Sequence, residues 1–221
     1  MWPLWGLLVG TLLLISSTPA VPAPPTPPEC SGPAGAGPSR CLYRSLLPSS
    51  GIVADCRTDR DCRVGYYYGS PAQPHWFTPP DGLSVLPKPE VIWHTATFAE
   101  TRVPCGRACT WSYFFEAKRR LLSAPRRDVL DVDYRRLLMA QVDGRALAIR
   151  QIFSARDIVR IEREWAPGLT AGSAITAIHF DADGRLSFTW LKGAEHASVS
   201  ERVPVPTYVR QGADATEKAP R

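Results

Sequence analysis

The sequence lacks the short motifs that mark the common enzyme classes. It contains no G-x-S-x-G nucleophile elbow, no H-E-x-x-H zinc helix and no G-x-x-x-x-G-K-[ST] phosphate loop. It also lacks a C-x-x-C pair, and every histidine is more than ten residues from any cysteine, so the usual spacing of a zinc site is missing. We therefore predict no catalytic, cofactor-binding or metal-binding residues, and a hydrolase without a recognisable motif is only a third hypothesis.

Long apolar runs are also scarce. The longest extends from Trp2 to Ile15 and is apolar or glycine except for one Pro and one Thr. It is shorter than the about 20 residues of a membrane-spanning helix, but it suits a signal-peptide core, with Thr18 and Ala20 before a cleavage site. No Lys or Arg precedes the run, so the alternative is an uncleaved anchor, the one case in which we expect membrane association.

The remaining composition is that of a globular protein. The 221 residues include 44% hydrophobic and 21% charged side chains, which argues against a disordered, collagen-like or multi-pass membrane protein. After a signal peptide at 1–20, prolines crowd residues 21–40, where we expect an extended linker. A single domain is expected at 41–209, and the polar residues 210–221 predict a disordered tail.

Cysteines are present in even number, and all of them follow the signal segment. They are Cys30, Cys41, Cys56, Cys62, Cys105 and Cys109. In an oxidising compartment an even set predicts disulfides and disfavours a cysteine nucleophile. Proximity along the chain suggests that neighbours pair in this order, although the sequence alone does not choose among the connectivities. Export and disulfides together predict a periplasmic or secreted protein.

Turn chemistry and alternating apolar residues predict a mainly β fold. Asp143-Gly144 and Asp183-Gly184 each lie between apolar runs, as expected for two-residue hairpin turns. The expected strands of the two hairpins, together with two strands rich in β-branched or aromatic residues, are 137–142, 146–153, 174–180, 186–191, 110–116 and 128–133.

The predicted architecture is an antiparallel meander over 90–209 that forms a barrel or a sandwich. An irregular region tied by disulfides is expected at 41–89, because turn-formers and prolines interrupt it. Ser154 to Asp157 resembles a capping box, so we expect at most one short helix, near 155–165.

Positive charge is concentrated in the middle of the chain. Residues 100–165 hold 14 Lys and Arg against 9 Asp and Glu, which accounts for the whole net charge of +5. Such a surface attracts an acidic protein, an anionic lipid or an anionic glycan, whereas nucleic acid is not expected without a recognition element. The alternative is solvated hairpin tips that discourage aggregation. The candidate partner-binding residues are Arg119, Arg120, Arg135 and Arg136.

A second candidate is the charged loop between Cys56 and Cys62. It contains Asp59, Arg60 and Asp61, and a disulfide across it would lower the entropy lost on binding a partner. The interleaved arginines disfavour calcium. A surface turn with local ion pairs is the alternative.

A third candidate is an aromatic group that flanks a Gly/Pro loop. Exposed rings there suit a protein or sugar surface, and the alternative is that they fill the space beneath an irregular segment. The group contains Tyr66, Tyr67, Tyr68, Trp76 and Phe77.

Two histidines lie in the region expected to be β-structure. His179 shares a strand face with Asp181 and Asp183, but the hairpin turn explains Asp183. His94 either faces outward or is a buried histidine with a hydrogen-bond partner, and neither histidine has a visible nucleophile to serve.

The leading hypothesis is an exported β-protein that binds another macromolecule, such as an inhibitor or immunity-type protein against an envelope-active enzyme or toxin. The alternative is an envelope structural or ligand-binding protein that contacts anionic lipid or glycan through its arginine-rich middle third. The first hypothesis requires a protein partner, and neither requires a cofactor.

Overall fold

The computed structural model describes residues 27–32, 38–47, 49–80, 83–106, 109–154 and 156–206. The predicted signal peptide, the predicted tail and most of the predicted linker lie outside these residues. In the described part the chain is antiparallel β-structure with one short helix, α1 (Ala171–Ala174), which confirms the predicted mainly β class. No helix of this part is long and apolar enough to cross a membrane.

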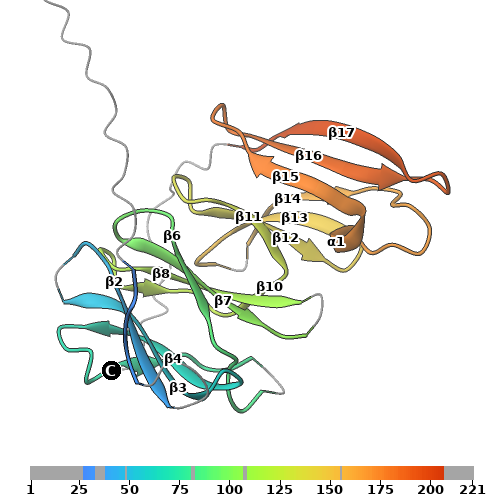
Figure 1. The fold of residues 1–221 in the computed structure, drawn as a ribbon. Helices are drawn as coiled ribbons and strands as arrows, with labels where there is room; N and C mark the ends of the chain where they lie inside the picture. Colours follow the sequence, from blue (N-terminus) through green and yellow to red (C-terminus); the bar gives the residue numbers. More distant parts are fainter. Residues whose placement is uncertain are drawn as a thin grey trace, which may run out of the picture.

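Four open sheets follow one another along the chain (Figure 1). The first contains β1 (Glu29–Ser31), β2 (Ser39–Arg44), β3 (Ser50–Thr58), β4 (Asp61–Tyr68) and β5 (His75–Trp76). The second contains β6 (Glu90–Trp93), β7 (Phe98–Pro104), β8 (Thr110–Glu116), β9 (Leu121–Leu122) and β10 (Arg126–Arg127). The third contains β11 (Val129–Asp133), β12 (Leu138–Asp143), β13 (Ala146–Gln151) and β14 (Asp157–Glu162), and the fourth contains β15 (Ile175–Phe180), β16 (Arg185–Lys192) and β17 (Ala197–Pro204).

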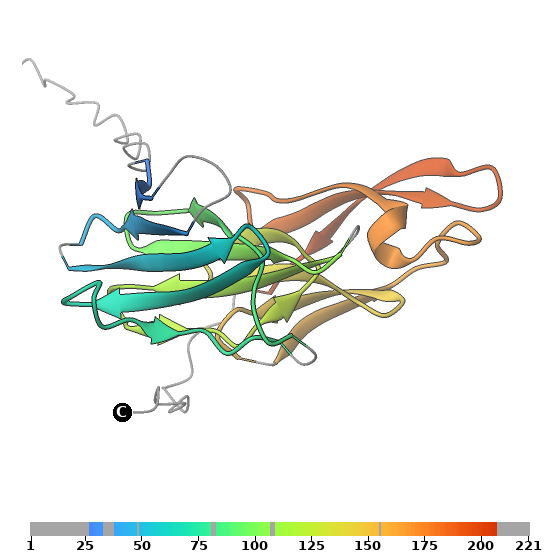
Figure 2. The same cartoon turned by 60° about the horizontal axis from the view of Figure 1, so that its bottom comes forward.

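Three hydrophobic cores join successive sheets. Ile52 of the first sheet and Phe115 of the second belong to one core, and Phe114 of the second sheet packs with Met139 of the third in another. The last core joins strands of the third and fourth sheets. Because the second sheet is buried on both faces, apolar residues in β8 do not alternate with polar ones. Figure 2 shows the first two sheets stacked at one side of the molecule and the fourth at the other.

The first sheet corrects the prediction of an irregular region at 41–89. Most of 41–76 is regular sheet, and Pro71 and Pro74 lie outside its strands. Cys30 lies directly opposite Cys41, and Cys56 directly opposite Cys62, so these cysteines belong to paired strands rather than to loops. Local composition therefore indicated the turns correctly, but it concealed the strands between them.

The three disulfides pair as proximity along the chain predicted. They are Cys30–Cys41, Cys56–Cys62 and Cys105–Cys109. Disulfides persist in oxidising compartments, so this set indicates an extracytoplasmic location.

The helix predicted near 155–165 is wrong. Residues 157–162 form β14, which pairs with the edge of β13 and buries Ile161. Hydrogen bonding to a neighbouring strand and burial outweigh the local capping signal. A capping box is present further along the chain, where the Thr170 side chain accepts the Ser173 backbone N–H and begins α1.

Both predicted hairpins are present, but their turns differ from the prediction. In the first, Asp143 pairs with Ala146, so the two-residue loop is Gly144-Arg145 rather than Asp143-Gly144. Gly144 has a φ of 62°, which glycine adopts without steric cost. In the second, Phe180 pairs with Leu186, and a longer loop joins the strands.

Candidate functional site

An open groove of about 850 Å³ lies beside the Cys56–Cys62 disulfide. Its lining combines charged side chains from the first sheet, one indole ring and an apolar side chain from the connection between β5 and β6. These residues include Arg40, Asp55, Arg57, Arg63, Trp76 and Val85. The groove therefore offers both polar and apolar contacts within one concave surface.

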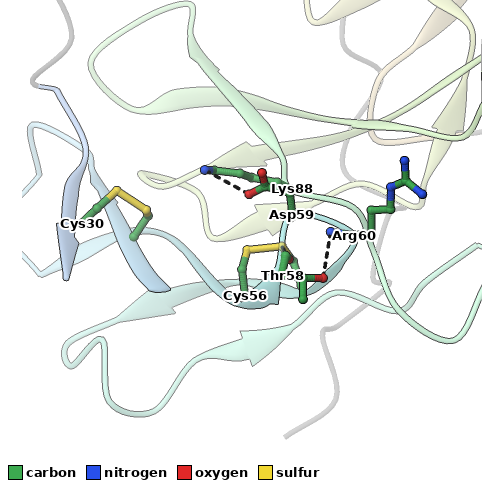
Figure 3. The surroundings of a disulfide bond; sticks show 8 residues. Cys30, Cys56, Thr58, Asp59, Arg60 and Lys88 are labelled. Atoms are coloured by element: carbon green, nitrogen blue, oxygen red, sulfur yellow. Dashed lines mark hydrogen bonds and ion pairs between the residues drawn. A yellow bond between two sulfur atoms is a disulfide. The ribbon is translucent and has the colours of Figure 1, made fainter. Parts of the chain in front are cut away.

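The charged loop between β3 and β4 borders this groove and is held from two sides (Figure 3). At its base the Cα atoms of Cys56 and Cys62 are 3.9 Å apart across the disulfide. Within the loop the Arg60 backbone N–H donates to Thr58 Oγ1 at 3.2 Å. These constraints preorganise the loop, which reduces the entropy that a bound partner would have to remove.

Lys88, in the connection between β5 and β6, also holds this loop in place. Its backbone N–H donates to the Asp59 carbonyl at 2.8 Å, and its Nζ lies 3.4 Å from Asp59 Oδ1 (Figure 3). The side chains of Asp59 and Lys88 are 81% and 50% exposed, so the ion pair adds little stability while presenting both charges to solvent.

The segment that carries Val85 is attached to the sheet by backbone hydrogen bonds. Leu86 and Cys62 exchange two of them, at 2.7 and 3.1 Å. The Leu86 side chain is buried in the first core, whereas Leu83 and Val85 are 37% and 39% exposed. This segment therefore supplies exposed apolar side chains beside the charged loop.

Trp76 and Arg63 form the aromatic part of the groove. The Arg63 guanidinium carbon lies 4.3 Å from the centroid of the Trp76 ring, a cation–π distance. Arg40 reaches Asp55 at 3.2 Å and also donates to the Pro71 carbonyl. The groove thus brings cations, carboxylates and an indole together.

The structure separates Trp76 from the other aromatic candidates. Tyr66, Tyr67 and Phe77 are at most 6% exposed, and Tyr68 is half-buried against the first core. Burial raises the pKa of the Tyr66 hydroxyl, because an ionised phenolate is poorly solvated there. Trp76 and Phe77 both line the groove, and Trp76 is the less buried of the two and contacts Arg63.

The arginine candidates occupy two turns and have different surroundings. Arg119 and Arg120 are exposed between β8 and β9, and Arg135 is exposed between β11 and β12. Arg136 is half-buried and bound to Asp133 at 2.5 Å.

Several arginines of the middle third form ion pairs. Arg150 and Arg160 both bind Asp143, at 2.6 and 2.7 Å, and Arg163 binds Glu201. Asp143 is already counted in the net charge of residues 100–165. Of these pairs, only Arg163–Glu201 brings a carboxylate from outside the segment and so lowers its free positive charge further.

His179 and Asp181 are a pair, as their shared strand face suggested. His179 Nε2 lies 2.9 Å from Asp181 Oδ1, and hydrogen bonds from Ser187 and Arg202 lower the pKa of Asp181. Asp183 accepts the Arg185 backbone N–H within the hairpin turn. Among the described residues no group of three His, Cys, Asp or Glu side chains is suited to hold a metal ion.

Comparison of the chain with protein-family models, curated proteins and solved structures gave no match. The function of the groove therefore has to be inferred from its own chemistry. Sequence reasoning identified the charged loop and Trp76 separately, but it missed Arg63 and the 83–88 segment. Their positions depend on the pairing of Gly65 with Trp76 and of Cys62 with Leu86, which no local pattern reveals.

Proposed function

We propose that the protein is exported and binds a protein partner through this groove and the adjoining loop. In this proposal it acts as an inhibitor or immunity-type protein against an envelope-active enzyme or toxin. The observation that carries the proposal is that the disulfide-tied loop and the Arg63–Trp76 pair border the same groove.

The residue types in the groove support protein binding. Tryptophan and arginine contribute most to affinity when they lie near the centre of an interface. The alternating charges of Arg57, Asp59 and Arg60 require a partner with the complementary pattern, which gives specificity. Since the disulfide and Lys88 already order the loop, little conformational entropy is lost on association.

Site-specific photocrosslinking in the producing cell tests the binding surface. We expect a crosslinker at Arg60 to give a discrete adduct with one protein, and the same crosslinker at Arg145 to give none. Arg145 is a matched control because it is also exposed in a hairpin turn, but in the third sheet. Absence of an adduct at Arg60, or identical adducts at both positions, contradicts the proposal.

The identified partner then tests the inhibitor role. Arg60→Ala with Trp76→Ala is expected to weaken the purified complex by at least about 100-fold, as loss of central interface residues does. An inhibitor lowers the partner's enzymatic or toxic activity when it is added, and the double variant does so only at correspondingly higher concentration. Binding without any effect on activity contradicts the inhibitor role and leaves a binding protein of another kind.

Export is tested separately by the mass of the protein recovered from the cell envelope or medium. A chain that begins at Val21 is expected if the signal segment is removed after Ala20.

A further inference from the structure

Three loops at one end of the first two sheets form a continuous surface, here called the basic tip and comprising the described residues 45–47, 49, 95–97 and 117–120. The Leu46 backbone N–H donates to the Ala96 carbonyl at 3.0 Å, and the Ala117 N–H donates to the Thr97 carbonyl at 2.8 Å. At the base of the first loop the Ser45 and Ser50 hydroxyls are 2.8 Å apart. The loops are therefore fastened to one another.

The basic tip exposes two adjacent leucines. Leu46 is 59% exposed, the largest value among the exposed large hydrophobic residues of the described chain, and Leu47 is 36% exposed. The Leu47 backbone N–H and carbonyl both bond to the Ser45 hydroxyl, at 3.1 and 3.0 Å. The leucines are thus held outward by their own loop instead of packing into a core.

The basic tip is also positively charged. Its loops contain Lys118, Arg119 and Arg120 but no Asp or Glu. All three basic side chains are exposed. Arg120 lies 5.2 Å from the centroid of the Tyr68 ring, and none of the ion pairs found among the described residues involves these three side chains.

Two carboxylates beside the basic tip, Glu29 and Glu116, are already engaged. Glu29 forms an ion pair with Arg44 at 3.0 Å. Glu116 is only 8% exposed and accepts the Lys118 backbone N–H at 3.2 Å. The surface of the basic tip is consequently cationic and apolar, without exposed acidic side chains of its own.

The N-terminal part of the chain reaches the fold at this same end. Glu29, which begins β1, pairs with Leu42 and binds Arg44, directly before the first loop of the tip. The first described strand therefore begins beside the basic tip. The residues upstream of Glu29 include the apolar run from Trp2 to Ile15.

We propose that the basic tip docks on an anionic phospholipid bilayer. Lys118, Arg119 and Arg120 bind lipid phosphates, and Leu46 and Leu47 enter the headgroup region. Basic residues are attracted to an anionic surface within a Debye length, while apolar side chains gain free energy on leaving water at the interface. The paired leucines and the entry point of the chain favour a bilayer over an acidic protein, for which positive charge alone would suffice.

This proposal is tested by measuring how the chain from Val21 to Arg221 binds to lipid vesicles. This form keeps the fold because every residue of the three cores lies between Tyr43 and Val205. We expect it to bind vesicles of phosphatidylcholine mixed with phosphatidylglycerol, to bind phosphatidylcholine alone much more weakly, and to lose affinity as salt is added.

Two double variants separate the contributions of charge and apolar contact. Arg119→Gln with Arg120→Gln is expected to weaken binding to the mixed vesicles by at least about tenfold. Leu46→Ser with Leu47→Ser is also expected to weaken it, by roughly tenfold. Arg145→Gln with Lys192→Gln is the matched control, because it removes the same charge from exposed side chains remote from the basic tip, and its affinity is expected to change by less than about threefold.

Several outcomes overturn the proposal. Absence of binding to the mixed vesicles excludes a bilayer docking surface. Equal losses of vesicle affinity in the tip variants and in the control variant indicate attraction by overall charge instead. Wild-type affinity in both tip variants also contradicts it. Each variant's unfolding midpoint, which should match that of the unchanged chain, shows whether a loss reflects misfolding. The basic tip and the groove share no residue, so either proposal can fail while the other stands.

Discussion

His94 Nε2 lies 3.1 Å from Glu100 Oε2, although the Glu100 side chain is completely buried. Arg102 donates two hydrogen bonds to the same carboxylate, at 2.8 and 3.1 Å, and Ser112 Oγ donates a third at 2.7 Å. Burial disfavours the charged carboxylate, but the hydrogen bonds from His94, Arg102 and Ser112 outweigh it and lower the pKa of Glu100 to about 2. His94 is thus a histidine with a structural partner, one of its two predicted alternatives.

Removing the charge of Glu100 should destabilise the fold. Glu100→Gln removes the carboxylate that is hydrogen-bonded to the partly buried Arg102, and we expect the free energy of unfolding to fall by about 3 kcal/mol. Urea unfolding measures this change. Glu195→Gln, at an exposed position, should change it by less than about 0.5 kcal/mol. Equal effects of the two substitutions would contradict a stabilising role for the cluster.

The same cluster predicts acid sensitivity. The pKa of Glu100 is lower in the folded chain than its ordinary value of 4.5, so the stability that it contributes is fully present above about pH 4.5 and is lost as the pH falls toward about 2. Unfolding free energies measured across this interval should fall more steeply for the unchanged chain than for Glu100→Gln. Parallel curves for the two proteins would refute the assignment.

Arg136 should stabilise the contact between the third and fourth sheets. Besides Asp133, it donates to the Gly184 carbonyl at 2.8 Å and to the Val205 carbonyl at 3.3 Å. Arg136→Ala is expected to lower the free energy of unfolding by about 2 kcal/mol, because charge-assisted hydrogen bonds are lost. The exposed neighbour Arg135 provides the comparison, and Arg135→Ala should cost less than about 0.5 kcal/mol.

The two disulfides of the first sheet should differ in their effect on binding. Replacing both cysteines of either pair by Ser is expected to cost about 2–3 kcal/mol of unfolding free energy, slightly more for Cys30–Cys41, which closes the longer loop. Loss of Cys56–Cys62 should weaken the proposed protein complex more than loss of Cys30–Cys41, since the former bridge holds the charged loop. Similar binding by both variants, measured by titration calorimetry, would argue against the preorganised loop.

Gly51 should be difficult to replace. A Cβ atom at this position would lie 2.4 Å from the Tyr43 carbonyl oxygen and 2.8 Å from Tyr67 Oη, closer than atoms can approach without displacement. Gly51→Ala is therefore expected to cost more than about 2 kcal/mol. Gly193→Ala is the contrasting variant, because Gly193 has a φ of 67° and open space around it, and only its backbone conformation should cost about 1 kcal/mol. Thermal unfolding distinguishes these results.

Features that depend on neighbours in the chain were predictable. Thr110–Glu116 forms β8 with the predicted bounds, because a run of β-branched and aromatic residues favours a strand wherever it packs. The disulfide pairs also join the nearest cysteines. The mainly β class and the two hairpins follow from the same kind of local information.

Features that depend on distant residues were decided only by the tertiary structure. Asp157–Glu162 is a strand because the edge of β13 supplies hydrogen-bond partners that outweigh the local helix signal. Ion pairing also depends on distant residues. Arg163 binds Glu201 of another sheet, and the net charge of a sequence segment does not reveal that contact. The Arg63–Trp76 contact in the groove likewise depends on the sheet pairing of Gly65 with Trp76. Sequence alone determined which residues tend to form strands, turns and bridges, whereas packing and strand register decided which of them share a surface, because the free energy of those contacts comes from residues far apart in the chain.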